Sequence, residues 1–167
     1  MNDELTPMDI QKMQEELEYR RLTLRPEIIE EVKRTRAFGD LSENYEYKAA
    51  KQAQRRNDSR MRYLENMIKT ARVIEDTTPE GQIGLFDRVT IYLEEDEEEQ
   101  VIQVVTTVRC DPSKGYISKE SPLGKAILGR QVGDRVSVRV SDDYTYTLVI
   151  RALEPAEDDG AAPLLQY

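Results

Sequence analysis

Residues 39–71 read GDLSENYEYKAAKQAQRRNDSRMRYLENMIKTA, and this stretch decides how the first half of the chain folds. From residue 47 onward, positions spaced alternately three and four apart form one stripe: Tyr47, Ala50, Gln54, Asn57, Met61, Leu64, Ile68 and Ala71. This spacing is typical of the seam of a coiled coil. Its two polar members, Gln54 and Asn57, are of the kind that fixes register at some cost in stability. We therefore predict a long helix that packs against a second helix.

The second helix is predicted upstream, over residues 7–38. Its apolar stripe consists of Ile10, Met13, Leu17, Leu24, Ile28 and Val32. Between Leu17 and Leu24, one position of the stripe is assigned to the charged residue Arg21. Pro26 lies inside this pattern, so we expect a kink or a break near residues 24–25. Because only residues 39–44 join the two helices, they must fold back as an antiparallel hairpin with this connection at its tip.

The second half of the chain has a different pattern, with short alternating segments that are typical of β-strands. We expect strands at 86–93, 101–108, 116–118, 135–140 and 144–153, and a short helix at 122–128. The acidic run 94–99 is expected to be a hairpin turn. The predicted fold class is thus α+β, with the following parts: an antiparallel coiled coil at 1–76, a linker at 77–81, a β domain at 82–154 and a disordered acidic tail at 155–167.

Composition narrows the possible chemistry. The chain has 167 residues and a net charge of −9, which argues against a protein that coats DNA regardless of sequence. It has no His and one Cys, which excludes Ser-His-Asp and Cys-His catalysis and His/Cys zinc sites. Carboxylates with an oxygen-ligated metal such as Mg²⁺ are the main catalytic option left. No apolar stretch approaches a membrane span, so we expect a cytoplasmic protein without a membrane partner.

Two carboxylates, Asp40 and Glu43, stand three residues apart where the chain reverses. In an ordinary helical turn, Asp40 would be an N-cap and Glu43 an acid of the first turn. At the end of a thin rod, the same pair can instead enter another molecule's cavity and help to hold a divalent cation. Two acids are too few for the six oxygen ligands of Mg²⁺, so a partner or a substrate phosphate would have to supply the rest.

The tip sequence Gly39-Asp40-Leu41-Ser42-Glu43-Asn44-Tyr45-Glu46-Tyr47, followed by Ala50, resembles the Gly-Asp-Leu-x-Glu-Asn-x-Glu-Tyr-x-x-Ala signature of the bacterial Gre transcript-cleavage factors, GreA and GreB. Upstream, Arg25-Pro26-Glu27-Ile28-Ile29 is similar to a first-helix segment of that family. In the second half, residues 121–129 and then Val132-Gly133-Asp134 resemble another family segment. The resemblance extends from about residue 5 to residue 153.

This resemblance implies an N-terminal coiled coil and an FKBP-like C-terminal β domain without isomerase activity. Family members bind RNA polymerase and pass the coiled coil down its secondary channel, where the tip acids assist hydrolysis of backtracked RNA. By position, Asp40 and Glu43 match the catalytic and metal-binding acids, and Ser42 fills a variable position where it can assist by hydrogen bonding. The chain is then an accessory factor, not an enzyme itself. Its Mg²⁺ would be shared with polymerase and not held tightly by the isolated protein.

The resemblance places part of the polymerase-binding surface at Ser121, Pro122 and Leu123. Candidates for contact with the nascent RNA 3′ end are the basic residues Lys48, Lys51, Arg55 and Arg56, for which a solvated coiled-coil face is an equal alternative. We expect a monomer. Two other functions stay open at this point: a non-catalytic inhibitor with the Gre fold that occupies the same channel, and a coiled-coil adaptor whose tip acids only cap helices.

Overall fold

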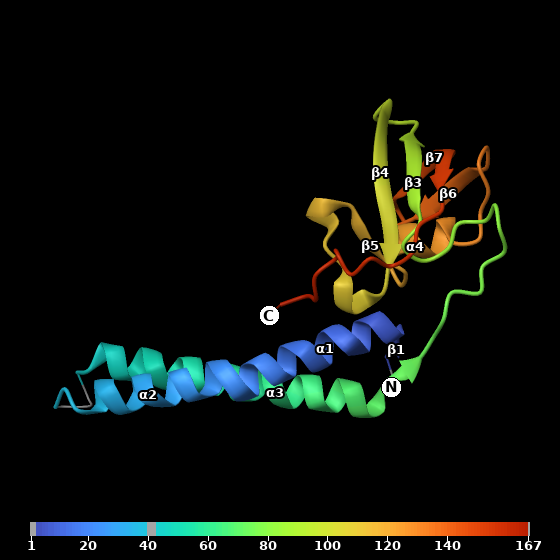
Figure 1. Ribbon diagram of the computed structural model, residues 1–167. Coiled ribbons are helices and arrows are strands. Elements are labelled where there is room, and N and C mark those ends of the chain that lie inside the picture. The colour runs from blue at the N-terminus through green and yellow to red at the C-terminus, as the bar shows by residue number, and fades with distance from the viewer. Residues whose placement is uncertain (1–2, 40–42, 167) are drawn as a thin grey trace. The chain divides into compact units, whose positions relative to one another are not determined.

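The structure is a computed structural model that describes residues 3–39 and 43–166 (Figure 1). By its internal contacts the chain divides into two compact units, one formed by Ile10–Arg72 and the other by Glu4–Asp9 together with residues 73–166. The first unit is helical and the second is built on a β-sheet, which confirms the α+β fold class. Within the described ranges, no helix has both the length and the apolar character needed to cross a membrane.

The helical unit is an antiparallel hairpin (Figure 1) of three helices, α1 (Pro7–Tyr19), α2 (Arg25–Arg36) and α3 (Tyr45–Thr70). The interruption predicted near residues 24–25 is present as a π-helical segment, Arg20–Leu24, in which the Arg25 N–H bonds to the Arg20 carbonyl. Pro26 follows at once and has no N–H, so the regular i→i−4 ladder is broken here. α1 and α2 therefore run on as one interrupted arm beside α3.

The seam of this hairpin is apolar with a polar centre. Four predicted seam residues on α3 are buried: Ala50, Asn57, Met61 and Leu64. Two more buried residues, Arg60 and Met67, lie outside the predicted stripe. Met67 and Ile68 share the last part of the seam, because a straight helix drifts relative to a strict heptad.

Arg60 is buried because an acid on the facing helix meets it. Its Nε and Nη2 donate to the two carboxylate oxygens of Glu16 at 2.7 and 3.1 Å. Glu16 also accepts from Arg20 at 2.9 Å, and Arg20 donates to Asn57 Oδ1 at 2.9 Å. Arg20 thus occupies the rung that we assigned to Arg21, whose half-exposed side chain instead pairs with Glu65 at 2.6 Å. The prediction was wrong by one residue: Arg20 lies three residues after Leu17 and four before Leu24, so it is the position that fits the spacing of the stripe.

The sheet unit contains one five-stranded sheet in the order β5-β4-β3-β7-β6. Its strands are β3 (Arg88–Leu93), β4 (Glu98–Val105), β5 (Tyr116–Ser118), β6 (Arg135–Arg139) and β7 (Thr145–Glu154). All neighbours are antiparallel except β4 and β5, which are parallel. The five predicted strands are confirmed, and the acidic run begins in the turn between β3 and β4, although its last two residues belong to β4.

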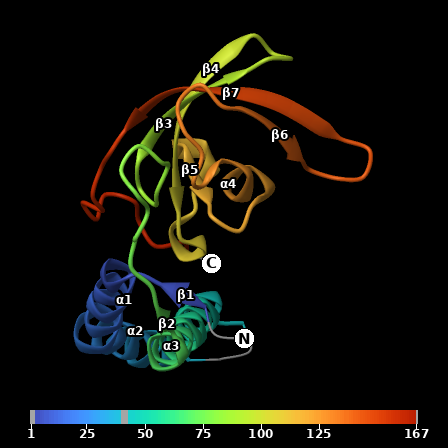
Figure 2. The same ribbon diagram turned by 90° about the vertical axis from the view of Figure 1, so that its right-hand side faces the viewer.

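The sheet curves around the short helix α4 (Pro122–Ile127), as Figure 2 shows. The core between them is wholly apolar and consists of Ile83, Val89, Ile91, Ile102, Val104, Ile127, Val136, Val138, Leu148 and Ile150. Smaller elements complete the described chain: the paired two-residue strands β1 (Glu4–Leu5) and β2 (Arg72–Val73), and the 3₁₀ turns Thr107–Arg109 and Pro112–Lys114.

Residues 155–166 follow a defined path on the sheet unit, although their composition led us to expect disorder. Ala162 and Leu164 are buried, and the N–H of Leu165 donates to the Val108 carbonyl at 2.7 Å. The fully buried Arg109 donates from Nε to the Ala162 carbonyl at 2.8 Å and forms an ion pair with Asp158. Composition counts the acids of this segment as solvated, whereas one of them neutralises a buried arginine.

Candidate functional site

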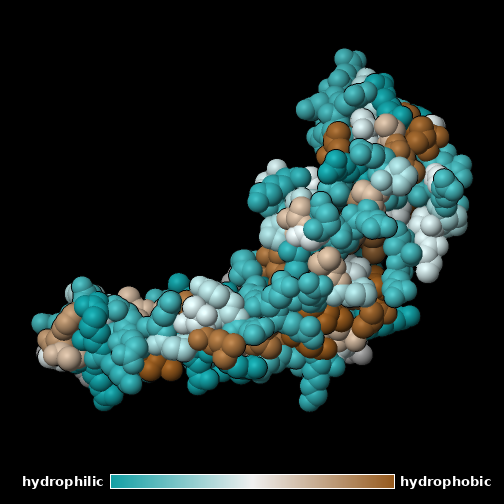
Figure 3. Space-filling view, in the orientation of Figure 1, coloured by the Kyte–Doolittle hydropathy of each residue, from teal (hydrophilic) through white to brown (hydrophobic). Residues whose placement is uncertain are grey.

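The predicted site lies at the end of the helical hairpin, where α2 and α3 meet (Figure 1). Asp40 and Ser42 fall outside the described residues. Glu43 is described and exposed to solvent. Gly39 has a φ of +107°, in the region that favours glycine, which allows the chain to leave α2. Figure 3 shows hydrophilic and more apolar surface side by side at this end of the hairpin.

Asn44 connects both helices at this end. Its Oδ1 accepts from the N–H of Tyr47 at 3.0 Å, so it is the N-cap of α3. Its Nδ2 donates to the carbonyl of Thr35 in the last turn of α2 at 2.6 Å. Thr35 is itself fully buried and bonds back to the Glu31 carbonyl at 2.8 Å. One side chain therefore fixes the end of one helix and the start of the next, a role that the sequence analysis missed although an Asn before a helix is a known capping signal.

The position of this N-cap determines which acid lies in the first turn of α3. Because Asn44 is the N-cap, the acid in the first turn of α3 is Glu46, and Glu43 precedes the helix. Among the residues that the structure describes, none forms a hydrogen bond or ion pair with the Glu43 carboxylate. Glu46, and not Glu43, is thus the acid that can stabilise the first turn of α3.

Aromatic rings paired with cations flank the connection on both sides. On the α2 side, the Arg34 guanidinium lies 5.1 Å from the centre of the Phe38 ring, and 55% of Phe38 is exposed. On the α3 side, the Lys48 ammonium lies 5.5 Å from the centre of the Tyr45 ring. A hydrogen bond from Arg34 lowers the pKa of Glu31, so both groups stay charged at neutral pH.

The predicted RNA-contact residues lie along the outside of α3. Lys48, Lys51 and Arg55 have the i, i+3, i+7 spacing of one helix face, opposite the buried seam. Lys51 is half-buried and donates to Gln54 at 3.0 Å, whereas Arg55 and Arg56 are exposed. Residues 20–62 hold 12 Lys and Arg against 7 Asp and Glu, so the outer part of the hairpin is positive in a chain of net charge −9.

The carboxylate chemistry at this end suits a hard cation such as Mg²⁺, which prefers oxygen ligands. Glu43, which is among the described residues, can supply one such ligand. Asp40 lies three residues before it in the sequence, outside the described residues. Over residues 3–39 and 43–166, no group of three or more potential ligand side chains comes together.

Two family models match almost the whole chain. The model described as "Transcription elongation factor, N-terminal" matches residues 4–73, and the one described as "Transcription elongation factor, GreA/GreB, C-term" matches residues 78–155. The chain belongs to the GreA/GreB family of transcription elongation factors. The family assignment made from the tip motif is thereby confirmed.

Individual relatives agree with this assignment. The transcription elongation factor GreA of Thermoanaerobacter pseudethanolicus is 44% identical over 137 residues, which cover 81% of this chain and 87% of the relative. GreA of Bacillus licheniformis is 40% identical over 136 residues, 81% of this chain and 86% of the relative. Among solved structures, GreA factor homolog 1 (Gfh1) of Thermus thermophilus is 25% identical, with coverage of 93% of this chain and 100% of that chain and a TM-score of 0.43.

In this GreA/GreB family chain, the second predicted contact surface lies at the start of α4. Ser121 is the N-cap: its Oγ accepts from the Gly124 N–H at 3.0 Å and donates to the Ser118 carbonyl at 2.6 Å. Pro122 is exposed at the first helical position, whereas Leu123 is half-buried against the sheet core. Of the two apolar residues, Pro122 is therefore the more available to a partner.

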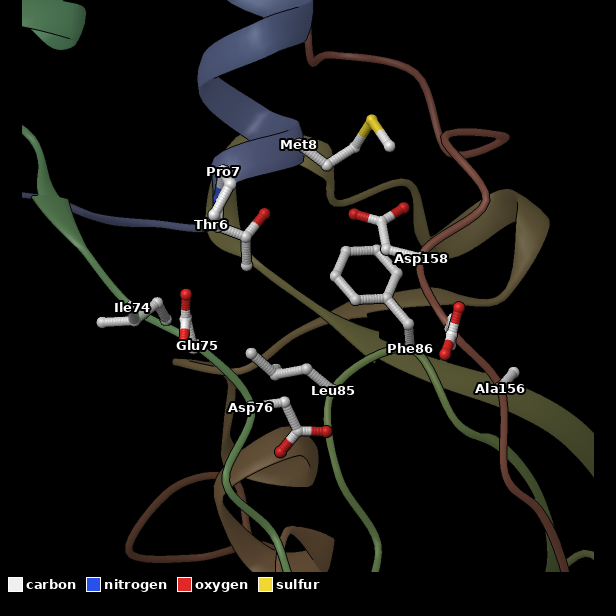
Figure 4. Close-up of a pocket in the computed structure, with 11 residues that line it drawn as sticks. Thr6, Pro7, Met8, Ile74, Glu75, Asp76, Leu85, Phe86, Ala156 and Asp158 are labelled. Atoms are coloured by element: carbon white, nitrogen blue, oxygen red, sulfur yellow. The ribbon is translucent and has the colours of Figure 1, made fainter.

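The sheet unit also contains a cavity of about 340 Å³ (Figure 4). It lies among residues 6–8, 74–76, 85–86 and 156–158, with Met8, Leu85 and Phe86 as apolar lining and Asp158 beside the Phe86 ring. None of the residues predicted to act on RNA or to bind polymerase lines it.

Proposed function

We propose that this chain binds RNA polymerase, inserts its helical hairpin into the secondary channel and stimulates Mg²⁺-dependent cleavage of backtracked RNA. The observation that carries the proposal is the state of Glu43: an exposed carboxylate at the end of a long hairpin, outside the helix that follows it and without a described partner. A carboxylate needed only for helix capping would instead bond to backbone N–H groups.

In this proposal the reaction is hydrolysis of an RNA phosphodiester. Mg²⁺ shared with polymerase would supply charge stabilisation and an activated water in a two-metal arrangement. Asp40 would contribute an oxygen ligand to the weakly held ion. Glu43 would accept the proton of the attacking water while the bond from phosphorus to the leaving 3′ oxygen breaks, and Ser42 would assist by hydrogen bonding.

Contacts outside the tip would hold the two partners. The exposed basic residues of α3, above all Lys48 and Arg55, can neutralise RNA phosphates. Ser121, Pro122 and Leu123 would contribute to the polymerase-binding surface, with Pro122 as its exposed member. The chain itself is then an accessory factor, because the phosphodiester bond is cleaved in the active site of polymerase.

The test is transcript cleavage by backtracked polymerase complexes. Glu43→Gln and Asp40→Asn should each lower the stimulated rate by about 10²–10⁴-fold, the usual contribution of a general acid or base. Folding should change by no more than about 0.5 kcal/mol, as is usual for surface substitutions. Glu46→Gln is the matched control, since Glu46 is an exposed acid three residues further along, and it should keep most of the activity.

Other outcomes contradict the proposal in distinct ways. A wild-type chain that binds polymerase and blocks cleavage would make it an inhibitor that occupies the channel. A chain that neither stimulates nor blocks cleavage would leave the hairpin as an adaptor. Full stimulation by the Asp40→Asn/Glu43→Gln double variant would reject the assignment of these acids to the chemistry.

A further inference from the structure

The first residue of α3 is an aromatic side chain that the hairpin does not use for packing. At 79% exposure, Tyr45 is the most exposed large hydrophobic side chain of the described residues. It is nevertheless held in place at its backbone, because it directly follows the N-cap Asn44, which accepts from the N–H of Tyr47. A rigid backbone thus presents an open ring to the surroundings of the tip.

A cation lies against this ring. The Lys48 ammonium, one helical turn along α3, is 5.5 Å from the ring centre, which is within the distance of a cation–π contact. Across the connection, Phe38 and Arg34 repeat the arrangement at 5.1 Å. Each arm of the hairpin therefore ends in an exposed ring with a basic side chain beside it. A single exposed aromatic residue is ordinary on a protein surface, but this paired arrangement at one end is not.

We propose that Tyr45, with Lys48 beside it, is a stacking platform for a nucleobase of single-stranded RNA. An aromatic ring stacks on any base, because every base has a π face, and a neighbouring cation neutralises the adjacent phosphate. Residues 39–47 hold three acids and no Lys or Arg, so the cations that favour RNA over a protein partner here are Lys48 beside Tyr45 and Arg34 beside Phe38. The inference rests on the proposed function, since it takes the extruded 3′ segment of the transcript as the strand that is bound.

The platform also places RNA close to the tip acids. Glu43 and Tyr45 are two residues apart, so their Cα atoms are separated by at most about 7 Å. A nucleotide whose base lies on the Tyr45 ring therefore has its phosphate within reach of the region of Glu43. Tyr45 is a positioning residue in this scheme: it orients the strand and takes no part in proton transfer.

The direct test uses full-length protein, polymerase complexes and a transcript with 2-aminopurine at the extruded 3′ position, because stacking quenches this base's fluorescence. Glu43→Gln keeps the RNA uncut, and this variant should quench the signal. Adding Tyr45→Ala should abolish the quenching, whereas adding Tyr45→Phe should preserve it. Tyr19→Ala is the matched control, since Tyr19 is a 54% exposed tyrosine on α1 outside the tip, and it should also preserve quenching.

A second measurement is RNA cleavage itself, in protein that keeps Glu43. Tyr45→Ala should raise the concentration of factor needed for half-maximal cleavage by between about fivefold and a hundredfold. With an abasic nucleotide at the same RNA position, wild type and Tyr45→Ala should become equal. A loss that persists on abasic RNA would mean that Tyr45 contacts polymerase, and the inference would be overturned.

The two proposals fail separately. If wild type stimulates cleavage but Tyr45→Ala matches it in both quenching and half-maximal concentration, the stacking platform is rejected and the proposed function stands. If quenching depends on Tyr45 but wild type does not stimulate cleavage, the platform stands and the proposed function is rejected. Circular dichroism of each variant checks that α3 is intact.

Discussion

The helical hairpin and the sheet unit each bury one arginine, and the two arginines are held in different ways. In the hairpin, Arg60 is 6% exposed and meets Glu16 on the facing arm. Glu16 keeps 16% of its side chain exposed and has a second cationic partner in Arg20. All of these groups sit at a seam between two helices that apolar contacts already align, and water reaches the edge of the network.

In the sheet unit, Arg109 is completely buried. Its Nη1 lies 3.3 Å from Asp9, its Nη2 lies 2.7 Å from Asp158, and its guanidinium lies 4.6 Å from the centre of the Phe86 ring. Burial acts to lower the pKa of Arg109, but the hydrogen bonds and charges of Asp158 and Asp9 outweigh it and raise that pKa above its ordinary value. The arginine is therefore charged in the core, and it joins segments that are 100 and 49 residues away in sequence.

A buried charge stabilises the fold most where no other group can replace it. In the hairpin the network selects a register between neighbours, and each of its members has an alternative partner or some contact with water. In the sheet unit one cation joins Asp9 and Asp158, which both belong to that unit. Removing it leaves buried carboxylates without compensation.

The largest effect is therefore expected for Arg109→Met. This change should lower the free energy of unfolding by about 3–5 kcal/mol, because it leaves the fully buried Asp9 and the mostly buried Asp158 without their cation. Urea denaturation followed by circular dichroism measures the loss. Arg130→Met, at an exposed arginine of the same unit, should stay within about 0.5 kcal/mol of wild type. A loss for Arg109→Met no greater than that for Arg130→Met would contradict the role of Arg109 as the cation that compensates Asp9 and Asp158.

A smaller loss, about 1.5–3 kcal/mol, is expected for Arg60→Met, which removes hydrogen bonds to a charged group while Glu16 keeps Arg20. The measurement is the same unfolding experiment, with Arg62→Met as the exposed control on the same helix. If Arg60→Met lowered the free energy of unfolding as much as Arg109→Met does, the proposed difference between the local network of Arg60 and the long-range ion pairs of Arg109 would be wrong.

The features of the fold and of the site that the sequence predicts are those formed by residues close together in the chain. The seam of α3, the strands and the tip motif are local patterns, and residues such as Ala50, Asn57 and Leu64 could be placed from spacing alone. Asn44 carried a capping signal that was there to be read. Lys48 and Arg55 could be placed on the outer face of α3, because only a regular helix was needed.

The remainder depended on information that spacing does not contain. The spacing predicted an interruption before Pro26, but it did not predict that the interruption takes the form of a π-helical segment, Arg20–Leu24. The C-terminal segment contacts Arg109, but nothing in the sequence pairs Asp9, Arg109 and Asp158. Such long-range ion pairs exist only once the sheet has formed, so they cannot be deduced from the composition of the tail.

The smallest effect concerns an arginine–glutamate pair on the surface of the sheet unit, in which the arginine side chain is 68% exposed. Arg135 donates to both carboxylate oxygens of Glu94, at 2.7 and 2.9 Å, and this hydrogen bonding lowers the pKa of Glu94. A lowered carboxyl pKa means that the pair stabilises the fold above the ordinary Glu pKa of about 4.3 and ceases to do so as the pH falls through the lowered value.

Arg135→Gln should therefore raise the pKa of Glu94 toward its ordinary value, which NMR titration of the Glu94 side chain measures. The matched control is Arg139→Gln on the same strand, since Arg139 pairs with Asp142 and should leave Glu94 unchanged. Because solvent screens an exposed pair, stability at neutral pH should change far less than for Arg109→Met or Arg60→Met. An unchanged pKa of Glu94 in Arg135→Gln would show that the surface pair does not persist in solution. A loss of stability comparable to that of Arg60→Met would show instead that burial is not what ranks the three arginines.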